Sequence, residues 1–97
     1  MFARLTRITA DPERVDEFEP IVREQVLPAA QKMAGFQGMY AMVDRQSGTA
    51  LSFTLWESEE AMRASEEGAN RLRSEAAARG SAEIVAVEHY EVILQPD

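Results

Sequence analysis

The sequence predicts an α+β fold, and three observations lead to this prediction. Four segments rich in β-branched and aromatic residues have the length of strands, two amphipathic segments have the length of helices, and the order is β-α-β-β-α-β. The 97 residues, 45% of them hydrophobic, suffice for one domain with a packed core. We therefore expect a single domain over residues 1–97, with an antiparallel four-stranded sheet and both helices on one face, in the ferredoxin-like arrangement.

The first half of the chain is predicted to hold a strand, a helix and a second strand. Residues 2–9 lack glycine and proline and form the first strand, although each of its faces carries an arginine. Asp11-Pro12-Glu13 is typical of a helix start, with a carboxylate cap followed by a proline that needs no hydrogen bond. The helix ends at Gly35, and we expect a kink or break near Pro28. Residues 36–44 form the second strand.

The second half is predicted to hold a hairpin loop, a strand, a helix and a last strand. In the loop over residues 44–49, Gly48 is free to adopt a positive φ. The third strand follows at residues 50–57, and Ser58 caps a helix that runs to about residue 79, with an interruption at Gly68. The last strand covers residues 82–94.

Both faces of the last predicted strand are apolar. A solvated antiparallel face would instead alternate with polar residues. We therefore expect the sheet face opposite the helices to be buried in a homodimer, with Val87 and Ile93 in the interface. An apolar face left exposed on a monomer is the alternative.

Charge and composition argue against several classes of function. The net charge of −7 disfavours binding to nucleic acid and to anionic membrane surfaces. The chain has no cysteine, and His89 with Glu91 lacks the further ligands that a metal site needs, so we expect no metal. We expect no nucleotide cofactor either, because no glycine-rich phosphate-binding motif is present. No apolar stretch is long enough to span a bilayer, which favours the cytoplasm.

The inward stripe of the second predicted helix consists mostly of small residues. These are Ala61, Ser65, Gly68, Ala69, Leu72 and Ala76. Opposite them we expect Phe53 and Leu55 of the third strand. Small side chains either let helix and sheet pack closely or leave a cavity for a small apolar ligand, and the sequence leaves both alternatives open. The side chains that could line such a cavity are Trp56, Tyr40, Tyr90, Met39, Met42 and Met62.

Three segments of the chain resemble the antibiotic biosynthesis monooxygenase family. They are Gly-Phe-Gln-Gly at 35–38, Asp-Arg-Gln-Ser-Gly at 44–48 and Thr-Leu-Trp-Glu-Ser-Glu-Glu-Ala-Met at 54–62. The resemblance implies a dimeric α+β barrel, and members of the family include cofactor-independent enzymes that oxidise polycyclic phenols to quinones. In that branch a Trp at the end of the third strand, an Asn four residues earlier, a Tyr six residues later and an Arg further along form the site. The matching positions here hold Trp56, Ser52, Met62 and Arg73.

The resemblance argues against the haem-degrading branch of the same family. That branch uses an Asn on the first strand, a second Trp on the helix and a His after it. Here Ala3 and Ser65 stand at the first two positions, and the second predicted helix contains no histidine.

The leading interpretation is a cofactor-independent monooxygenase that binds a small aromatic or polyketide-like phenol between its helices and sheet. The catalytic candidates are Trp56 and Arg73, and the substrate-binding candidates are Ser52, Met62, Phe53 and Ala69. The alternative is a non-catalytic dimeric protein of the same fold that binds a small molecule or a partner. Ser52 and Met62 favour this alternative, because they replace the Asn and Tyr of the active relatives, whereas the motif around Trp56 favours the enzyme.

Overall fold

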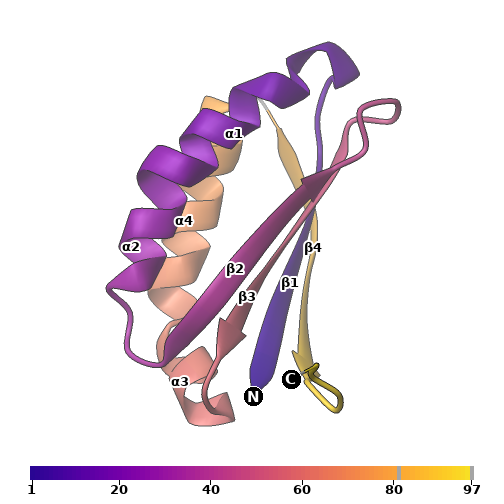
Figure 1. The fold of residues 1–97 in the computed structure, drawn as a ribbon. Coiled ribbons are helices and arrows are strands. Elements are labelled where there is room, and N and C mark those ends of the chain that lie inside the picture. Colours follow the sequence, from indigo (N-terminus) through magenta and orange to yellow (C-terminus); the bar gives the residue numbers. More distant parts are fainter. Residues whose placement is uncertain (81, 97) are drawn as a thin grey trace.

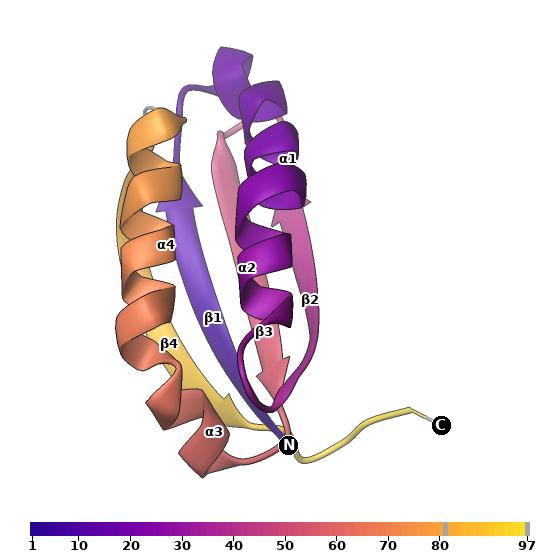
Figure 2. The ribbon, with the colours of Figure 1, turned by 90° about the vertical axis from the view of Figure 1, so that its left-hand side faces the viewer.

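The computed structural model describes residues 1–80 and 82–96, in which four strands form one sheet. The strands are β1 (Phe2–Thr9), β2 (Phe36–Val43), β3 (Thr49–Trp56) and β4 (Glu83–Glu91). Their order in the sheet is β2-β3-β1-β4, and all neighbouring strands are antiparallel. The helices lie together on one face of the sheet (Figure 1), and Figure 2 looks through this helical layer onto the strands. The predicted ferredoxin-like α+β fold is confirmed.

The first helical segment is a rod of four short pieces. They are the 3₁₀ helix η1 (Pro12–Glu17), α1 (Phe18–Ile21), the π turn η2 (Val22–Val26) and α2 (Leu27–Gln31). Asp11 caps the rod as predicted, because its carboxylate accepts a hydrogen bond of 2.9 Å from the backbone N–H of Glu13. The irregularity expected near Pro28 takes the form of the π turn that precedes it. Pro28 has no N–H, so the carbonyl of Glu24 cannot receive the usual α-helical hydrogen bond.

The second helical segment is divided into α3 (Glu59–Ala64) and α4 (Glu66–Arg79). Ser58 caps α3 as predicted, since its hydroxyl accepts a 3.1 Å hydrogen bond from the N–H of Ala61. The expected interruption at Gly68 is wrong: the break falls at Ser65. There the carbonyl of Met62 accepts hydrogen bonds from the Arg4 guanidinium and the Ser65 hydroxyl, both of 2.7 Å. The Met62 carbonyl thus accepts hydrogen bonds from side chains, and the helix breaks at the point where Arg4 of β1 contacts this carbonyl.

Strand register decides which side chains of the sheet face the helices. On β1 the inward residues are Arg4 and Thr6, which are 2% and 4% exposed. Their neighbours on β3 are Thr54 and Ser52, so the alternate residues of β3, Phe53 among them, point to the opposite face. The expectation that Phe53 and Leu55 lie opposite the second helix is therefore wrong. The physical reason is the two-residue period, which turns both side chains outward once Arg4 is directed inward.

The last strand contains an irregularity that moves its side chains between faces. Arg7 pairs with Ala86 and Ile8 with Ile84, so Val85 is an extra residue on β4. Beyond this bulge Val87 pairs with Thr6 and lies on the helix side of the sheet. Its predicted place in an interface on the outer face is therefore wrong. Ile93 lies after the end of β4 and is 92% exposed.

Glycines allow close packing at the ends of the helices. Gly35 has a φ of +81°, and a Cβ there would lie 2.5 Å from the Cβ of Ala61. A Cβ on Gly68 would lie 3.2 Å from the Cε of Met33. At Ala61 and Gly68 the small side chains thus permit close approach, as the close-packing alternative predicts.

Candidate functional site

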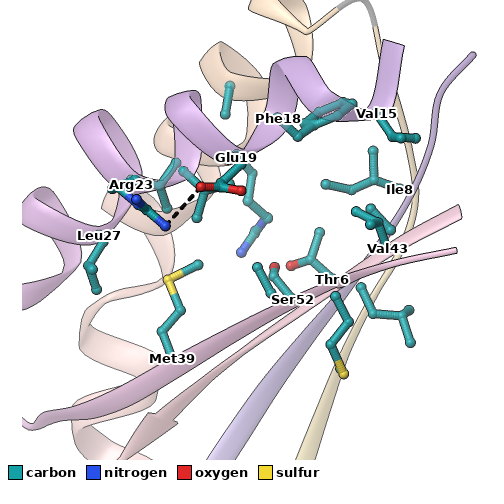
Figure 3. Close-up of a pocket in the computed structure, with 18 of the residues that line it drawn as sticks. Thr6, Ile8, Val15, Phe18, Glu19, Arg23, Leu27, Met39, Val43 and Ser52 are labelled. Atoms are coloured by element: carbon teal, nitrogen blue, oxygen red, sulfur yellow. Dashed lines mark ion pairs between the residues drawn. The ribbon is translucent and has the colours of Figure 1, made fainter. Parts of the chain in front are cut away.

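A cavity of about 410 Å³ lies between the first helical segment, α4 and the helix side of the sheet. Figure 3 shows the residues that form it, with Val15, Phe18 and Leu27 on the helical side and Met39, Val43 and Ile8 on the sheet. Most of the wall is apolar, and its volume lies in the range typical of small-molecule sites. A cavity between helices and sheet therefore exists beside the closely packed contacts, but it lies mainly under the first helical segment, and of the small residues of the second helix only Ala76 is in its lining.

Three polar side chains line the inner part of this cavity. Thr6 and Ser52 are cross-strand neighbours on β1 and β3, and they lie side by side on its floor (Figure 3). Arg73 enters from α4. Its Nε and Nη1 are buried and have no hydrogen-bond partner among the residues that the structure describes, and its Nη2 makes only a long 3.4 Å bond to Asn70. Burial lowers the pKa of Arg73, as does the nearby charge of Arg4, while Glu66 raises it.

The charged side chains at the mouth of the cavity are paired with one another. Glu19 and Arg23 form an ion pair of 2.8 Å, drawn as a dashed line in Figure 3, and Asp16 pairs with Arg45. All four are exposed, so these pairs contribute little to stability. Within residues 1–80 and 82–96, the unpaired charge of the lining therefore belongs to Arg73.

A second charged group lies behind the inner end of the cavity. Arg4 is buried, and its Nη2 lies 2.5 Å from Oε2 of Glu66. Its guanidinium carbon lies 5.4 Å from the ring centroid of Trp56. His89 Nε2 lies 3.0 Å from Oε1 of the same carboxylate. Burial by itself raises the pKa of Glu66. The combined effect of Arg4, His89 and Arg73 in lowering it is larger, so the pKa of Glu66 lies below its ordinary value.

The structure does not bring the predicted site residues together in one place. Arg73 and Ser52 line the cavity. Trp56 and Met62 are buried beside Arg4, outside the lining, and the Trp56 N–H already donates a 2.9 Å hydrogen bond to Thr54. Ala69 is buried but is not among the lining residues, and Phe53 belongs to the outer face.

Sequence reasoning missed Thr6, the apolar residues of the first helical segment and the role of Arg4. Arg4 and Thr6 follow each other at a two-residue spacing on the first strand, which was the available signal that they share a face. The spacing left the orientation of the strand undetermined, because Arg7 lies on the opposite face from Arg4 and Thr6.

Two further features of the described residues bear on ligands and membranes. No three His, Cys, Asp or Glu side chains within residues 1–80 and 82–96 come together as a metal site. No helix in this part of the chain has both the length and the apolar character of a membrane span.

Residues 1–77 match the family described as antibiotic biosynthesis monooxygenase. The chain belongs to this family. The uncharacterised family relative Rv2558 of Mycobacterium tuberculosis is 44% identical over 77 residues, which are 79% of this chain and 33% of the relative. The match thus spans about a third of the length of that curated protein.

Solved structures share the fold of this antibiotic biosynthesis monooxygenase family member. HapK from Hahella chejuensis has a TM-score of 0.76 at 16% identity, covering 100% of this chain and 97% of its own. A monooxygenase from ActVA-Orf6 of Streptomyces coelicolor, solved in complex with nanaomycin D, has a TM-score of 0.66 at 16% identity and covers 99% of this chain and 92% of its own. At this level of identity the likeness establishes the fold, and the activity has to be argued from the site.

Proposed function

We propose that this protein is a cofactor-independent monooxygenase that oxidises a small aromatic or polyketide-like phenol in the cavity. The observation that supports this most directly is Arg73, an arginine in the lining of an otherwise largely apolar cavity, whose buried Nε and Nη1 have no hydrogen-bond partner among the described residues. Apolar walls suit aromatic rings, and a guanidinium suits an oxygen that bears negative charge. Family membership supports the reaction class.

The proposed reaction replaces a ring C–H of the phenol by a carbonyl. The ionised phenol gives electrons to O₂, a bond forms between one oxygen atom and the ring carbon, and the O–O bond breaks as water leaves. One phenol and one O₂ thus yield one quinone and one water. The substrate is itself the reductant, so the reaction needs no added flavin, haem or metal. Arg73 stabilises the ionised oxygen, while the apolar walls keep solvent from the reacting atoms.

Trp56 acts in this proposal as a positioning residue. Its N–H is engaged by Thr54, and its ring supports the guanidinium of Arg4. Arg4 in turn holds Glu66, one of the charges that influence Arg73. Met62 supports this arrangement through its carbonyl, which accepts a hydrogen bond from Arg4, and Ser52 with Thr6 can donate hydrogen bonds to the ligand.

Oxygen consumption with a panel of dihydroxyanthracene-like phenols tests the proposal, with protein-free autoxidation as the reference. Wild type should exceed autoxidation without added cofactor, and Arg73→Gln should lower the catalysed rate by about 100-fold, the usual effect of losing one oxyanion donor. Trp56→Phe should have a smaller effect. Arg71→Gln is the matched control, because Arg71 is exposed on the same helix. A wild-type rate no higher than autoxidation for every phenol would disprove the proposal.

A non-catalytic dimeric protein that binds small molecules is the second candidate. Ser52 and Met62 favour it, because neither side chain offers the amide or the phenol expected at these positions in active relatives. Met62 is also buried at the break between α3 and α4. Such a protein would bind the phenols or their quinones and consume no oxygen.

The homodimer belongs to the same proposal. No element of residues 1–80 and 82–96 covers the sheet face opposite the helices (Figure 1). This outer face carries Leu5, Phe53 and Leu55, with Tyr40 and Tyr90 exposed at its sides. We expect two copies to bury at least ~1,200 Å² in total by pairing these faces.

A further inference from the structure

The two edges of the sheet differ in how they are protected from pairing with further strands. β2 and β4 are the edge strands, and within residues 1–80 and 82–96 each pairs with one neighbour only. β4 carries three glutamates and a histidine, and it contains the bulge at Val85. Charged residues and bulges are the common means of blocking unwanted strand pairing. The edge of β4 is therefore protected.

The edge of β2 has no such protection. This strand has the sequence Phe-Gln-Gly-Met-Tyr-Ala-Met-Val, without a charged residue or a proline, and from Gly38 to Val43 its pairing with β3 is regular. Tyr40, Met42 and Val43 are 63%, 46% and 41% exposed. A regular, apolar and exposed edge of this kind readily pairs with another extended segment.

The segment that follows β4 is apolar and makes little contact with its own domain. Residues 92–96 form neither helix nor strand, and the backbone hydrogen bond nearest their end runs from the N–H of Val92 to the carbonyl of Met1, at 2.9 Å. Ile93 and Leu94 are 92% and 86% exposed, more than any other large hydrophobic side chain among the described residues. In Figure 1 the segment lies on the side of the sheet away from the helices, and in Figure 2 it extends past β2.

Ile93 and Leu94 cannot reach the β2 edge of their own chain. The sheet order places β2 three strand spacings from β4, so a strand added beyond β2 would lie a fourth spacing away, about 19 Å in all. Ile93 and Leu94 follow Glu91, the last residue of β4, by two and three positions, and a fully extended chain covers only about 7–11 Å over that length. The β2 edge within their reach is that of another molecule.

We propose that residues 92–95 of one copy add as a strand to the β2 edge of a second copy, and that the second copy does the same in return. These residues are uncharged and fit the uncharged β2 edge, whereas the β4 edge presents glutamates. Backbone groups on both sides supply the hydrogen bonds, and Ile93 and Leu94 pack beside the exposed side chains of β2. A two-fold axis makes both contacts together. The inference rests on the proposed homodimer, and it adds the exchanged segment and the edge that receives it.

Disulfide trapping tests the contact directly, because the chain contains no cysteine. Tagged chains with Ile93→Cys are mixed with untagged chains that carry Tyr40→Cys, Ala41→Cys or Met42→Cys, and the mixture is mildly oxidised. Opposed residues of neighbouring strands lie close enough for a disulfide, so at least one of these pairs should give a cross-linked heterodimer in high yield. The control pairs Ile93→Cys with Ala78→Cys, at an exposed position of α4, and should give little cross-linked product.

The strength of the dimer provides a second readout. Ile93→Asn combined with Leu94→Asn should raise the dimer Kd in sedimentation equilibrium by about 100-fold, because burial of each aliphatic side chain accounts for about tenfold. Ile93→Val combined with Leu94→Val keeps two aliphatic side chains suited to a strand, so its Kd should stay within about threefold of wild type. Both changes leave the packed core untouched, since the two side chains are almost fully exposed in the single chain.

A dimer of unchanged strength in the double asparagine variant would overturn the exchange and leave the proposed dimer through the outer face intact. Disulfides formed within one chain, or equal yields with the Ala78→Cys control, would overturn it as well. Wild type that sediments only as a monomer would reject the exchange and the homodimer together. The proposed oxidation of phenols is decided separately, by the oxygen-consumption assay.

Discussion

At the scale of single residues, Arg4 determines much of the interior. Its guanidinium donates to the Met62 carbonyl and the Ser65 hydroxyl, pairs with Glu66 and lies over Trp56. Burying an arginine without such partners would cost several kcal/mol, so β1 has to turn this face toward the helices. Burial lowers the pKa of Arg4, whereas Glu66 raises it, and an arginine remains charged at neutral pH.

The lowered pKa of Glu66 predicts how stability depends on pH. A carboxylate whose pKa is lower in the folded than in the unfolded chain stabilises the fold above its unfolded pKa, near 4.5, and loses this contribution as the pH falls through the folded pKa. Wild type should therefore exceed Glu66→Gln in unfolding free energy by about 1 kcal/mol at pH 7, a modest value because Glu66 is 41% exposed. Urea unfolding at pH 7 and pH 3 should show this difference shrinking at pH 3. A difference that is the same at both pH values, or matched by Glu67→Gln, would contradict it.

At the scale of elements, the hairpin between β2 and β3 shows how a short loop positions two strands. Gly48 has a φ of +80°, and its carbonyl accepts a 3.0 Å hydrogen bond from the N–H of Ala10. The loop is closed by a 2.9 Å hydrogen bond from the Gly48 N–H to the Asp44 carbonyl. The predicted positive φ is confirmed, and the contact with Ala10 ties the loop to the end of β1.

Gly48→Ala should destabilise the protein by about 2–4 kcal/mol. An alanine at this position would have an unfavourable positive φ, and its methyl group would lie 2.0 Å from the carbonyl oxygen of Ala10. Gly38→Ala is the control, because a Cβ there meets only Leu55, at 4.0 Å. Denaturant unfolding measures both variants. Equal stability of the two variants would show that the loop can shift without cost.

At the scale of the whole molecule, the two faces of the sheet differ in their side chains and in what covers them. The helix side carries the cavity and the charged groups around Arg4. The outer face is mostly apolar, although it includes the charged residues Arg7 and Glu88, and it has no cover in the described part of the chain. Because each strand alternates its side chains, the same four strands supply both surfaces. A residue changed on the outer face should therefore affect assembly more than ligand binding.

Phe53→Glu should shift the proposed dimer to a monomer of 10.8 kDa in sedimentation equilibrium at micromolar concentration. The substitution would place a charge in a desolvated interface. Ala78→Glu adds the same charge at an exposed position of α4 and should leave the dimer intact. The substitution is made at Phe53 and not at Val87, because Val87 faces the helices and a change there would not test the outer face. Wild type that sediments only as the monomer would rule out the dimer.

Local patterns sufficed for the order and type of the elements. The β-α-β-β-α-β order, the caps at Asp11 and Ser58 and the positive φ of Gly48 are all visible in short stretches of sequence, and the structure confirms them. Two of the proposed site residues, Arg73 and Ser52, line the cavity, and their catalytic and substrate-binding roles stay predictions. Their signal was the resemblance around Trp56, which contains no information about the direction of each side chain.

The tertiary structure alone decided which face of each strand is inside. An arginine on either face of β1 left its orientation undetermined, and the contacts of Arg4 with Met62, Ser65 and Glu66 resolved it. The same contacts place the helix break at Ser65 and not at Gly68, and the pairing of Val87 with the inward Thr6 places Val87 on the helix side. Propensity and periodicity depend on residues close in the chain, whereas these choices depend on contacts between residues about 60 positions apart, which become adjacent only when the sheet and helices pack.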